Sequence, residues 1–134
     1  MIDSSNTKVD NPLLLIAEDN ESNYLLFEFL LKRDYSLMHA VNGREAIRLF
    51  KQRHPQLILM DIKMPEVDGY KATEEIRKIS KSIPIIAITA YAFPEDQERI
   101  LSSGFNAYLS KPIDPLELRK TIKKLLHSSS PIQN

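Results

Sequence analysis

Short apolar runs alternate with longer amphipathic segments along most of the chain, and this alternation is the strongest constraint on its fold. The runs span residues 13–17, 37–41, 56–60, 83–88 and 107–109. Continuous apolar runs of this length are typical of strands buried on both faces, as in a parallel sheet. The runs at 37–41 and 107–109 are the weaker two, and we count them as the second and fifth of five strands.

The segments between the runs have apolar residues at helical spacing. The first two expected helices include residues 24–31 and 46–50. The third runs from about Tyr70 to Ile79, the fourth from about Pro94 to Ser102, and the fifth has Pro115 as its first helical residue. The His54–Pro55 pair ends the second helix, because a residue before proline avoids the α conformation. Gly104 is a candidate cap after the fourth helix, and Asp114 is a candidate N-cap of the fifth.

Two of these helices have broad expected apolar faces. The first face comprises Tyr24, Leu25, Phe27, Leu30 and Leu31. The last helix is expected to pack through Leu116, Leu118, Ile122 and Leu125. Strand and helix thus alternate five times, which favours an α/β fold with a doubly wound parallel sheet and helices on both faces.

The chain of 134 residues is short enough to form one domain. We expect that domain to span residues 12–127. The polar segment 1–11 and the Ser/Pro-rich segment 128–134 are expected to be disordered.

Composition excludes several classes of protein. Cysteine is absent, which rules out disulfides and Cys-based metal sites. The three glycines, Gly43, Gly69 and Gly104, lie too far apart for a Walker loop or a dinucleotide-binding motif. The 18 basic and 18 acidic residues cancel, so no net positive field attracts nucleic acid. No apolar run approaches the ~20 residues of a membrane span, so we expect no membrane insertion and a cytoplasmic location.

Polar side chains follow or end four of the predicted strands. Glu18 and Asp19 follow the first strand, Asp61 follows the third, Thr89 ends the fourth and Lys111 follows the fifth. In a parallel sheet these positions share the edge at which open α/β sheets bind ligands. Each residue alone has an ordinary structural interpretation, such as a solvated turn or an N-cap, but their joint placement favours a site.

The charges of this group suggest its chemistry. Three crowded carboxylates repel one another, and a hard cation such as Mg²⁺ relieves the repulsion. A lysine opposite them can pair with a carboxylate or with phosphate oxygens. A carboxylate can itself accept a phosphoryl group as an acyl phosphate.

Four separated motifs carry a resemblance to a known family. They are AEDN at 17–20, MDIKMPEVDGY at 60–70, IAITAYA at 86–92 and SKPID at 110–114. In this order they resemble the receiver domain of two-component response regulators, over nearly the whole chain. The resemblance implies a flavodoxin-like, five-stranded parallel sheet with the strand order 2-1-3-4-5 and five helices.

The resemblance also implies roles for single residues at the acidic site. Asp61 is the implied phosphoacceptor and a ligand of Mg²⁺. Asp19 is an implied direct ligand, Glu18 acts mainly through water, and Lys63 offers its backbone carbonyl.

Other implied roles concern phosphate binding and switching. Lys111, across a cis bond to Pro112, and the Ala90 amide are implied phosphate contacts, and Thr89 is the implied switch hydroxyl. Tyr108 is similar to the family's aromatic switch, although a half-buried structural tyrosine is a nearly equal alternative. Lys63 and Tyr91 are expected to influence the lifetime of the phosphoryl group.

The expected function is that of a phosphoacceptor signalling switch in a two-component phosphorelay. A sensor histidine kinase or a histidine phosphotransfer domain is the expected partner, and a phosphorylation-dependent dimer is allowed. The domain would catalyse its own phosphorylation and slow dephosphorylation without being a turnover enzyme. Either a stand-alone regulator or the receiver of a hybrid histidine kinase fits, and ITAYAF and GFNAYLSKPI resemble hybrid-kinase and phosphorelay receivers more.

Two alternatives stay open at this point. An aspartate-nucleophile phosphatase would need a second Asp as acid in a D-x-D motif, and Lys63 stands there instead. A degenerate receiver would act as an interaction module without phosphate, but the complete set of acids, Thr89 and Lys111 argues against it.

Overall fold

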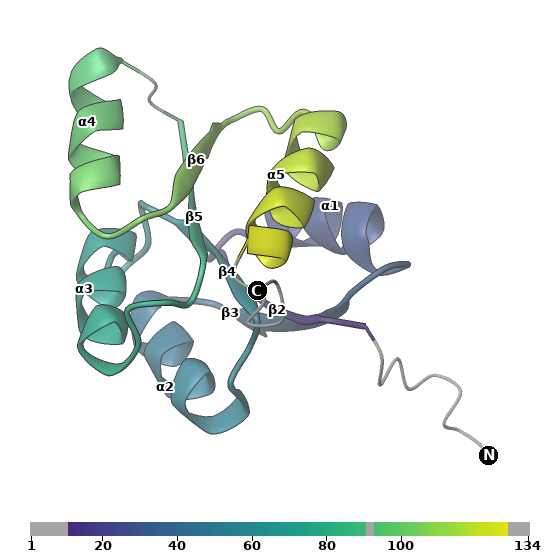
Figure 1. The fold of residues 1–134 in the computed structure, drawn as a ribbon, viewed down its shortest axis with the longest axis horizontal. Coiled ribbons are helices and arrows are strands. Elements are labelled where there is room, and N and C mark those ends of the chain that lie inside the picture. The colour runs from purple at the N-terminus through teal and green to yellow at the C-terminus, as the bar shows by residue number, and fades with distance from the viewer. Residues whose placement is uncertain (1–10, 91–92, 129–134) are drawn as a thin grey trace.

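The computed structural model describes residues 11–90 and 93–128 and contains one five-stranded parallel sheet (Figure 1). The strands are β2 (Leu13–Ala17), β3 (Ser36–Ala40), β4 (Leu57–Asp61), β5 (Ile85–Thr89) and β6 (Ala107–Ser110). Their spatial order is β3-β2-β4-β5-β6. In chain order this is 2-1-3-4-5, which confirms the predicted sheet.

Helices cover both faces of the sheet (Figure 1). They are α1 (Glu21–Leu31), α2 (Gly43–Arg53), α3 (Gly69–Ile79), α4 (Pro94–Ser102) and α5 (Pro115–Ser128). The strands alternate their side chains between two cores, as a sheet covered on both sides requires. Leu15 and Ala17 pack with α2, α3 and α4, whereas Leu14 and Ile16 pack with α1 and α5.

Side-chain caps explain where several helices begin. Asn20, Asn42 and Asp68 each accept a hydrogen bond from the backbone N–H three positions later. Asp114 accepts one from the Leu116 N–H at 2.9 Å, as its predicted capping role requires. Gly104 follows the end of α4 with a φ of 103°, which suits glycine at that position.

Two predicted apolar contacts are wrong. Leu25 is 50% exposed on α1 and Leu116 is 65% exposed on α5. Each residue lies two positions before a buried residue, Phe27 or Leu118. Two positions rotate a helical side chain by about 200°, which turns Leu25 and Leu116 away from the sheet.

Several boundaries differ slightly from those predicted. The third and fourth strands lie at 57–61 and 85–89, so Asp61 is the last residue of its strand and does not follow it. The His54 φ of 51° ends α2 in the left-handed region. Helix α5 continues to Ser128, one residue past the predicted domain end. The rest of the predicted terminal segments, 1–10 and 129–134, lies outside the described residues.

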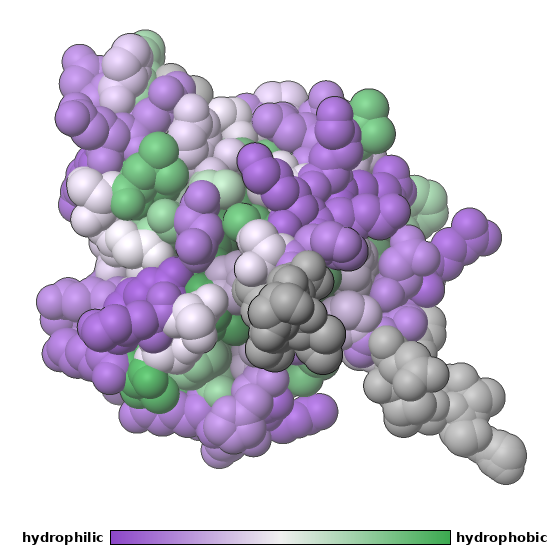
Figure 2. Space-filling model, viewed as in Figure 1, coloured by the Kyte–Doolittle hydropathy of each residue, from purple (hydrophilic) through white to green (hydrophobic). Residues whose placement is uncertain are grey.

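The surface over α5 is mainly hydrophilic (Figure 2). Among the described residues, no helix combines the length and the apolar character needed to cross a membrane. A cavity of about 830 Å³ lies at the amino ends of the strands, where Pro12, Pro84 and His127 contribute to its lining. The polar groups singled out from the sequence lie at the opposite edge.

Candidate functional site

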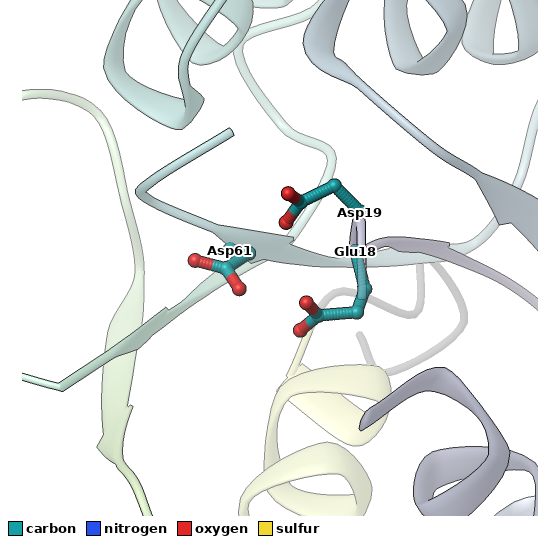
Figure 3. Close-up of side chains that lie close together, drawn as sticks. All are labelled: Glu18, Asp19 and Asp61. Atoms are coloured by element: carbon teal, nitrogen blue, oxygen red, sulfur yellow. The ribbon is translucent and has the colours of Figure 1, made fainter. Parts of the chain in front are cut away.

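Three acidic side chains converge at the carboxyl edge of the sheet (Figure 3). Glu18 and Asp19 follow β2, and Asp61 ends β4. One carboxylate oxygen from each lies within 4.8 Å of those of the other two. Glu18 and Asp61 are buried, with 1% and 4% of their surface exposed, and Asp19 is exposed.

The strand register explains this convergence. Strands β2 and β4 are parallel neighbours, and Ala17 is paired with Met60. The next residues, Glu18 and Asp61, therefore lie side by side where the two strands end. The sequence prediction of a shared acidic edge is confirmed by this pairing.

The Glu18 carboxylate is only partly satisfied. Its Oε2 accepts hydrogen bonds from the Asn20 N–H at 3.1 Å and from the Asn23 side-chain amide at 3.5 Å. Its buried Oε1 has no hydrogen-bond partner within the described part of the chain, and the Lys111 ammonium is 3.8 Å away. Burial, and then the nearness of Asp61, raise the pKa of Glu18 to about 7.

Both oxygens of Asp61 accept hydrogen bonds. The Lys111 ammonium donates to Oδ2 at 2.9 Å, and the Lys63 backbone N–H donates to Oδ1 at 2.9 Å. Burial acts to lower the pKa of Lys111, but the hydrogen bond to Asp61 and the charges of the acids outweigh it and raise the pKa. The Lys111 ammonium therefore stays charged at neutral pH and partly balances the acids.

The acids open into a cavity of about 270 Å³. Besides the three acids, the predicted site residues that line it are Lys63, Thr89, Ala90 and Lys111. Thr89 is buried at the end of β5, and the Lys111–Pro112 peptide bond is cis. The structure thus brings together seven of the nine residues that the sequence suggested.

The other two candidates have different positions. Tyr108 is half-buried on β6 and packs against the core that α2, α3 and α4 cover, outside the lining of the cavity. Tyr91 lies outside the described residues. Lys63 is exposed, and its backbone N–H donates to Asp61.

Sequence reasoning assigned no role at the site to Gly69 or His39. A Cβ atom on Gly69 would lie 2.4 Å from the Asp61 carbonyl oxygen, so only glycine allows α3 to begin this close to the acid. The ring nitrogen Nε2 of His39 lies 2.8 Å from the Glu18 carbonyl oxygen. Gly69 belongs to the quoted motif at 60–70, which was a usable signal, whereas the His39 contact has no sequence motif.

A family model described as the response regulator receiver domain matches residues 14–123. The chain belongs to this family. Receiver domains act as signalling switches that work with histidine kinases or histidine phosphotransfer proteins, and an acidic pocket of this kind is typical of their phosphoacceptor site.

Named relatives of this receiver domain support the assignment. The polar-differentiation response regulator DivK of Brucella ovis is 42% identical over 116 residues, which cover 84% of this chain and 94% of DivK. The receiver domain of the sensor histidine kinase PA1611 from Pseudomonas aeruginosa, crystallised with a magnesium ion in its active-site cleft, is 35% identical. The TM-score is 0.81, and the match covers 87% of this chain and 98% of the PA1611 chain.

A third similarity is to a complex. A chain in the co-crystal structure of the Saccharomyces cerevisiae histidine phosphotransfer protein Ypd1 with the receiver domain of Ssk1 is 30% identical to this receiver domain. Its TM-score is 0.85, and the match covers 92% of this chain and 94% of that one.

Proposed function

We propose that Asp61 accepts a phosphoryl group from a phosphohistidine of a sensor kinase or a histidine phosphotransfer domain. The observation that carries this proposal is the setting of the Asp61 carboxylate. It lies at the end of β4, is held by the Lys111 ammonium at 2.9 Å, and faces a cavity lined by two more acids. A positioned carboxylate nucleophile beside a cation is what phosphoryl transfer requires of a protein.

The transfer forms one bond to phosphorus and breaks another. An oxygen of the Asp61 carboxylate forms a bond to phosphorus as the bond from phosphorus to the imidazole nitrogen of the donor breaks. The imidazole leaves with that electron pair. The Lys111 ammonium, the Thr89 hydroxyl and the Ala90 amide then donate to the phosphoryl oxygens, since all three line the same cavity.

The acids fit a hard divalent cation. Glu18 Oε1 is buried without a hydrogen-bond partner within residues 11–90 and 93–128, and a cation would satisfy it. We propose that Glu18, Asp19, Asp61 and the Lys63 carbonyl hold Mg²⁺, with Glu18 acting mainly through water. When bound, the ion supplies positive charge that balances the incoming phosphoryl oxygens.

The response to phosphorylation is proposed to pass from Thr89 to Tyr108. Thr89 is paired with Ser110, two residues beyond Tyr108 on β6, so the three side chains share one face of the sheet. A Thr89 hydroxyl drawn toward the phosphoryl group would leave space that the Tyr108 ring can enter. This change would alter the surface of α4, β6 and α5, which a partner could then recognise.

The donor needs a surface beside the acids. Helix α1 begins at Glu21, one residue after the acidic pair, and exposes Leu25, Leu26 and Phe29. We propose that this apolar surface docks the donor protein, because its first exposed residue is one turn from the start of the helix.

Two further predictions from the sequence are kept as proposals. Lys63 and Tyr91 are proposed to influence the lifetime of the phosphoryl group, and the protein is proposed to be cytoplasmic.

The proposal is tested by intact-mass measurement after incubation with acetyl phosphate and Mg²⁺. We expect one added phosphoryl group on the wild-type protein and none on Asp61→Asn, which keeps the side-chain size but removes the nucleophilic charge. Asp34→Asn is the matched control, because Asp34 is exposed beyond the far end of α1. A full adduct on Asp61→Asn would overturn the assignment, and no adduct on any of the proteins would favour the degenerate receiver.

A further inference from the structure

Both backbone polar groups of Glu18 are tied to β3. The Glu18 N–H donates to the Ala40 carbonyl at 2.9 Å, which adds one hydrogen bond beyond the last strand pair of Ala17 and Ala40. The Glu18 carbonyl oxygen lies 2.8 Å from Nε2 of His39. Because a carbonyl can only accept, Nε2 must carry the hydrogen. A side chain thus continues the attachment of the acidic segment to β3 after the strand itself has ended.

The imidazole of His39 is held in place from a second direction. The ring of Tyr24 stacks on it with a centroid separation of 3.8 Å and an interplanar angle of 4°. Tyr24 lies in the first turn of α1, which is capped by Asn20. Both aromatic residues are half-buried, so the stack shields one face of the imidazole and restricts its rotation.

We propose that His39 is a positioning residue for the metal site: its hydrogen bond to the Glu18 carbonyl, steadied by Tyr24, orients the peptide that joins Glu18 to Asp19. That peptide is planar, so fixing its carbonyl also fixes the direction of the Asp19 N–H and the start of the Asp19 residue. The inference rests on the proposed Mg²⁺ site.

The arrangement has an energetic consequence for cation binding. Without the imidazole donor, the Glu18–Asp19 peptide has more orientations available, and binding a cation must then include the cost of ordering it. Residues that orient metal ligands change metal affinity by on the order of tenfold or more when they are lost. The chemical step itself uses the Asp61 carboxylate and the Lys111 ammonium, whereas the ring of His39 bonds to the backbone of Glu18.

Two substitutions distinguish the contribution of the His39 N–H donor from that of its aromatic ring. His39→Phe keeps an aromatic ring for Tyr24 to stack on and removes the donor. His39→Gln keeps an N–H donor and removes the ring. His127→Phe is the matched control, because it makes the same chemical change at an exposed position near the end of α5.

The measurements are the Mg²⁺ dissociation constant by calorimetry and the rate of phosphorylation by acetyl phosphate as a function of Mg²⁺ concentration. For His39→Phe we expect the dissociation constant to rise on the order of tenfold. The half-saturating Mg²⁺ concentration should rise in parallel, while the rate at saturating Mg²⁺ changes little. His39→Gln should recover most of the affinity, and His127→Phe should match the wild type.

Several results would overturn the inference. Equal Mg²⁺ affinity in His39→Phe and His127→Phe would do so, whatever the melting temperature, and so would equal losses in His39→Phe and His39→Gln. If His39→Phe does not fold, the imidazole ¹⁵N spectrum of the wild type tests the inference instead. A ring that carries its hydrogen only on Nδ1 cannot donate from Nε2 to the Glu18 carbonyl, and this result would contradict the inference. If the wild type binds no Mg²⁺, both the proposed metal site and this inference are wrong. If the wild type and all His39 variants bind Mg²⁺ equally well, only this inference is wrong.

Discussion

The Lys111 ammonium lies 2.9 Å from Asp61 Oδ2, although 50 positions of sequence separate the two residues. Lys111 follows β6 and Asp61 ends β4, and these strands are separated in the sheet by β5. The lysine therefore reaches across a neighbouring strand to the acceptor. The positive charge of Lys111 therefore lies beside the Asp61 nucleophile before any phosphoryl group arrives.

Replacing Lys111 by Met should affect cation binding and phosphorylation in opposite directions. The loss of one positive charge strengthens the negative field of the acids, so Mg²⁺ should bind severalfold more tightly. Phosphorylation should fall strongly, because a donor to the phosphoryl oxygens is lost. Calorimetry and intact-mass measurements test the pair, with the exposed Lys78→Met as control. Weaker Mg²⁺ binding in Lys111→Met would contradict this account.

The raised pKa of Glu18 predicts a pH dependence of stability without metal. The folded protein holds the Glu18 proton up to about pH 7, whereas the unfolded chain releases it near its ordinary pKa of 4.5. The contribution of this group is complete below pH 4.5 and is lost as the pH rises to about 7. Melting in EDTA should show this loss in the wild type, and Glu18→Gln should remove that part of the profile. Identical pH profiles for the two proteins would contradict the shifted pKa.

Deprotonation of Glu18 should also make Mg²⁺ binding pH-dependent. Since Glu18 must be ionised to hold the cation through water, the cation competes with the proton, so affinity should increase from pH 6 to pH 8 and binding should release protons. Calorimetry in buffers of different ionisation enthalpy measures the released protons directly. Affinity independent of pH across this interval would show that Glu18 is already ionised without metal.

Gly69→Ala should destabilise the protein by about 1–3 kcal/mol, the usual cost of adding a methyl group where no space exists. The new Cβ would lie 2.4 Å from the Asp61 carbonyl oxygen, so α3 or the end of β4 must shift. Phosphorylation should fall as well, because the shift moves the acceptor. Urea unfolding and intact-mass measurements check both effects, and unchanged stability would contradict the close approach.

Thr89→Ala should confine the response to phosphorylation. With beryllofluoride as a phosphoryl mimic, NMR of the wild type should show chemical-shift changes from Thr89 through Tyr108 to α5. Without the hydroxyl, the changes should stay near Asp61, because nothing draws the end of β5 toward the mimic. Thr121→Ala on α5 is the control. Changes that spread equally far in Thr89→Ala would show that the hydroxyl is not the coupling element.

Phe29→Ser should weaken phosphotransfer from a protein donor and leave phosphorylation by acetyl phosphate unchanged. Phe29 is 75% exposed on α1, where a docking protein would bury it, but a small donor needs no such contact. Leu101→Ser is the control, because Leu101 is 50% exposed on α4. Equal transfer rates for Phe29→Ser and the wild type would place the docking surface elsewhere.

The sheet and the acidic site could be predicted because they depend on patterns that the sequence shows directly. Parallel strands buried on both faces appear as apolar runs, and the residue after each run falls at the same edge. That is why Glu18, Asp61 and Lys111 were assigned together although they are distant in sequence. The motifs then added what spacing alone does not give, such as the strand order.

The errors came from contacts that depend on rotation and on tertiary geometry. Leu25 and Leu116 are apolar, but helix rotation turns them outward, and composition does not show which of two adjacent apolar faces meets the sheet. The proposed role of His39 depends on one hydrogen bond to the Glu18 backbone carbonyl. The residue type at position 39 does not show whether its side chain reaches that carbonyl. Such contacts become visible only when β2 and β3 are placed side by side.

The cavity lined by Pro12 and His127 lies at the amino ends of the strands, on the opposite edge from Asp61. The described chain therefore enters and leaves the fold at the edge remote from the acids. A surface attachment joined next to Pro12 or His127 would leave the carboxyl edge open to a protein donor. For immobilised binding measurements, this geometry makes positions next to Pro12 and His127 suitable anchoring points.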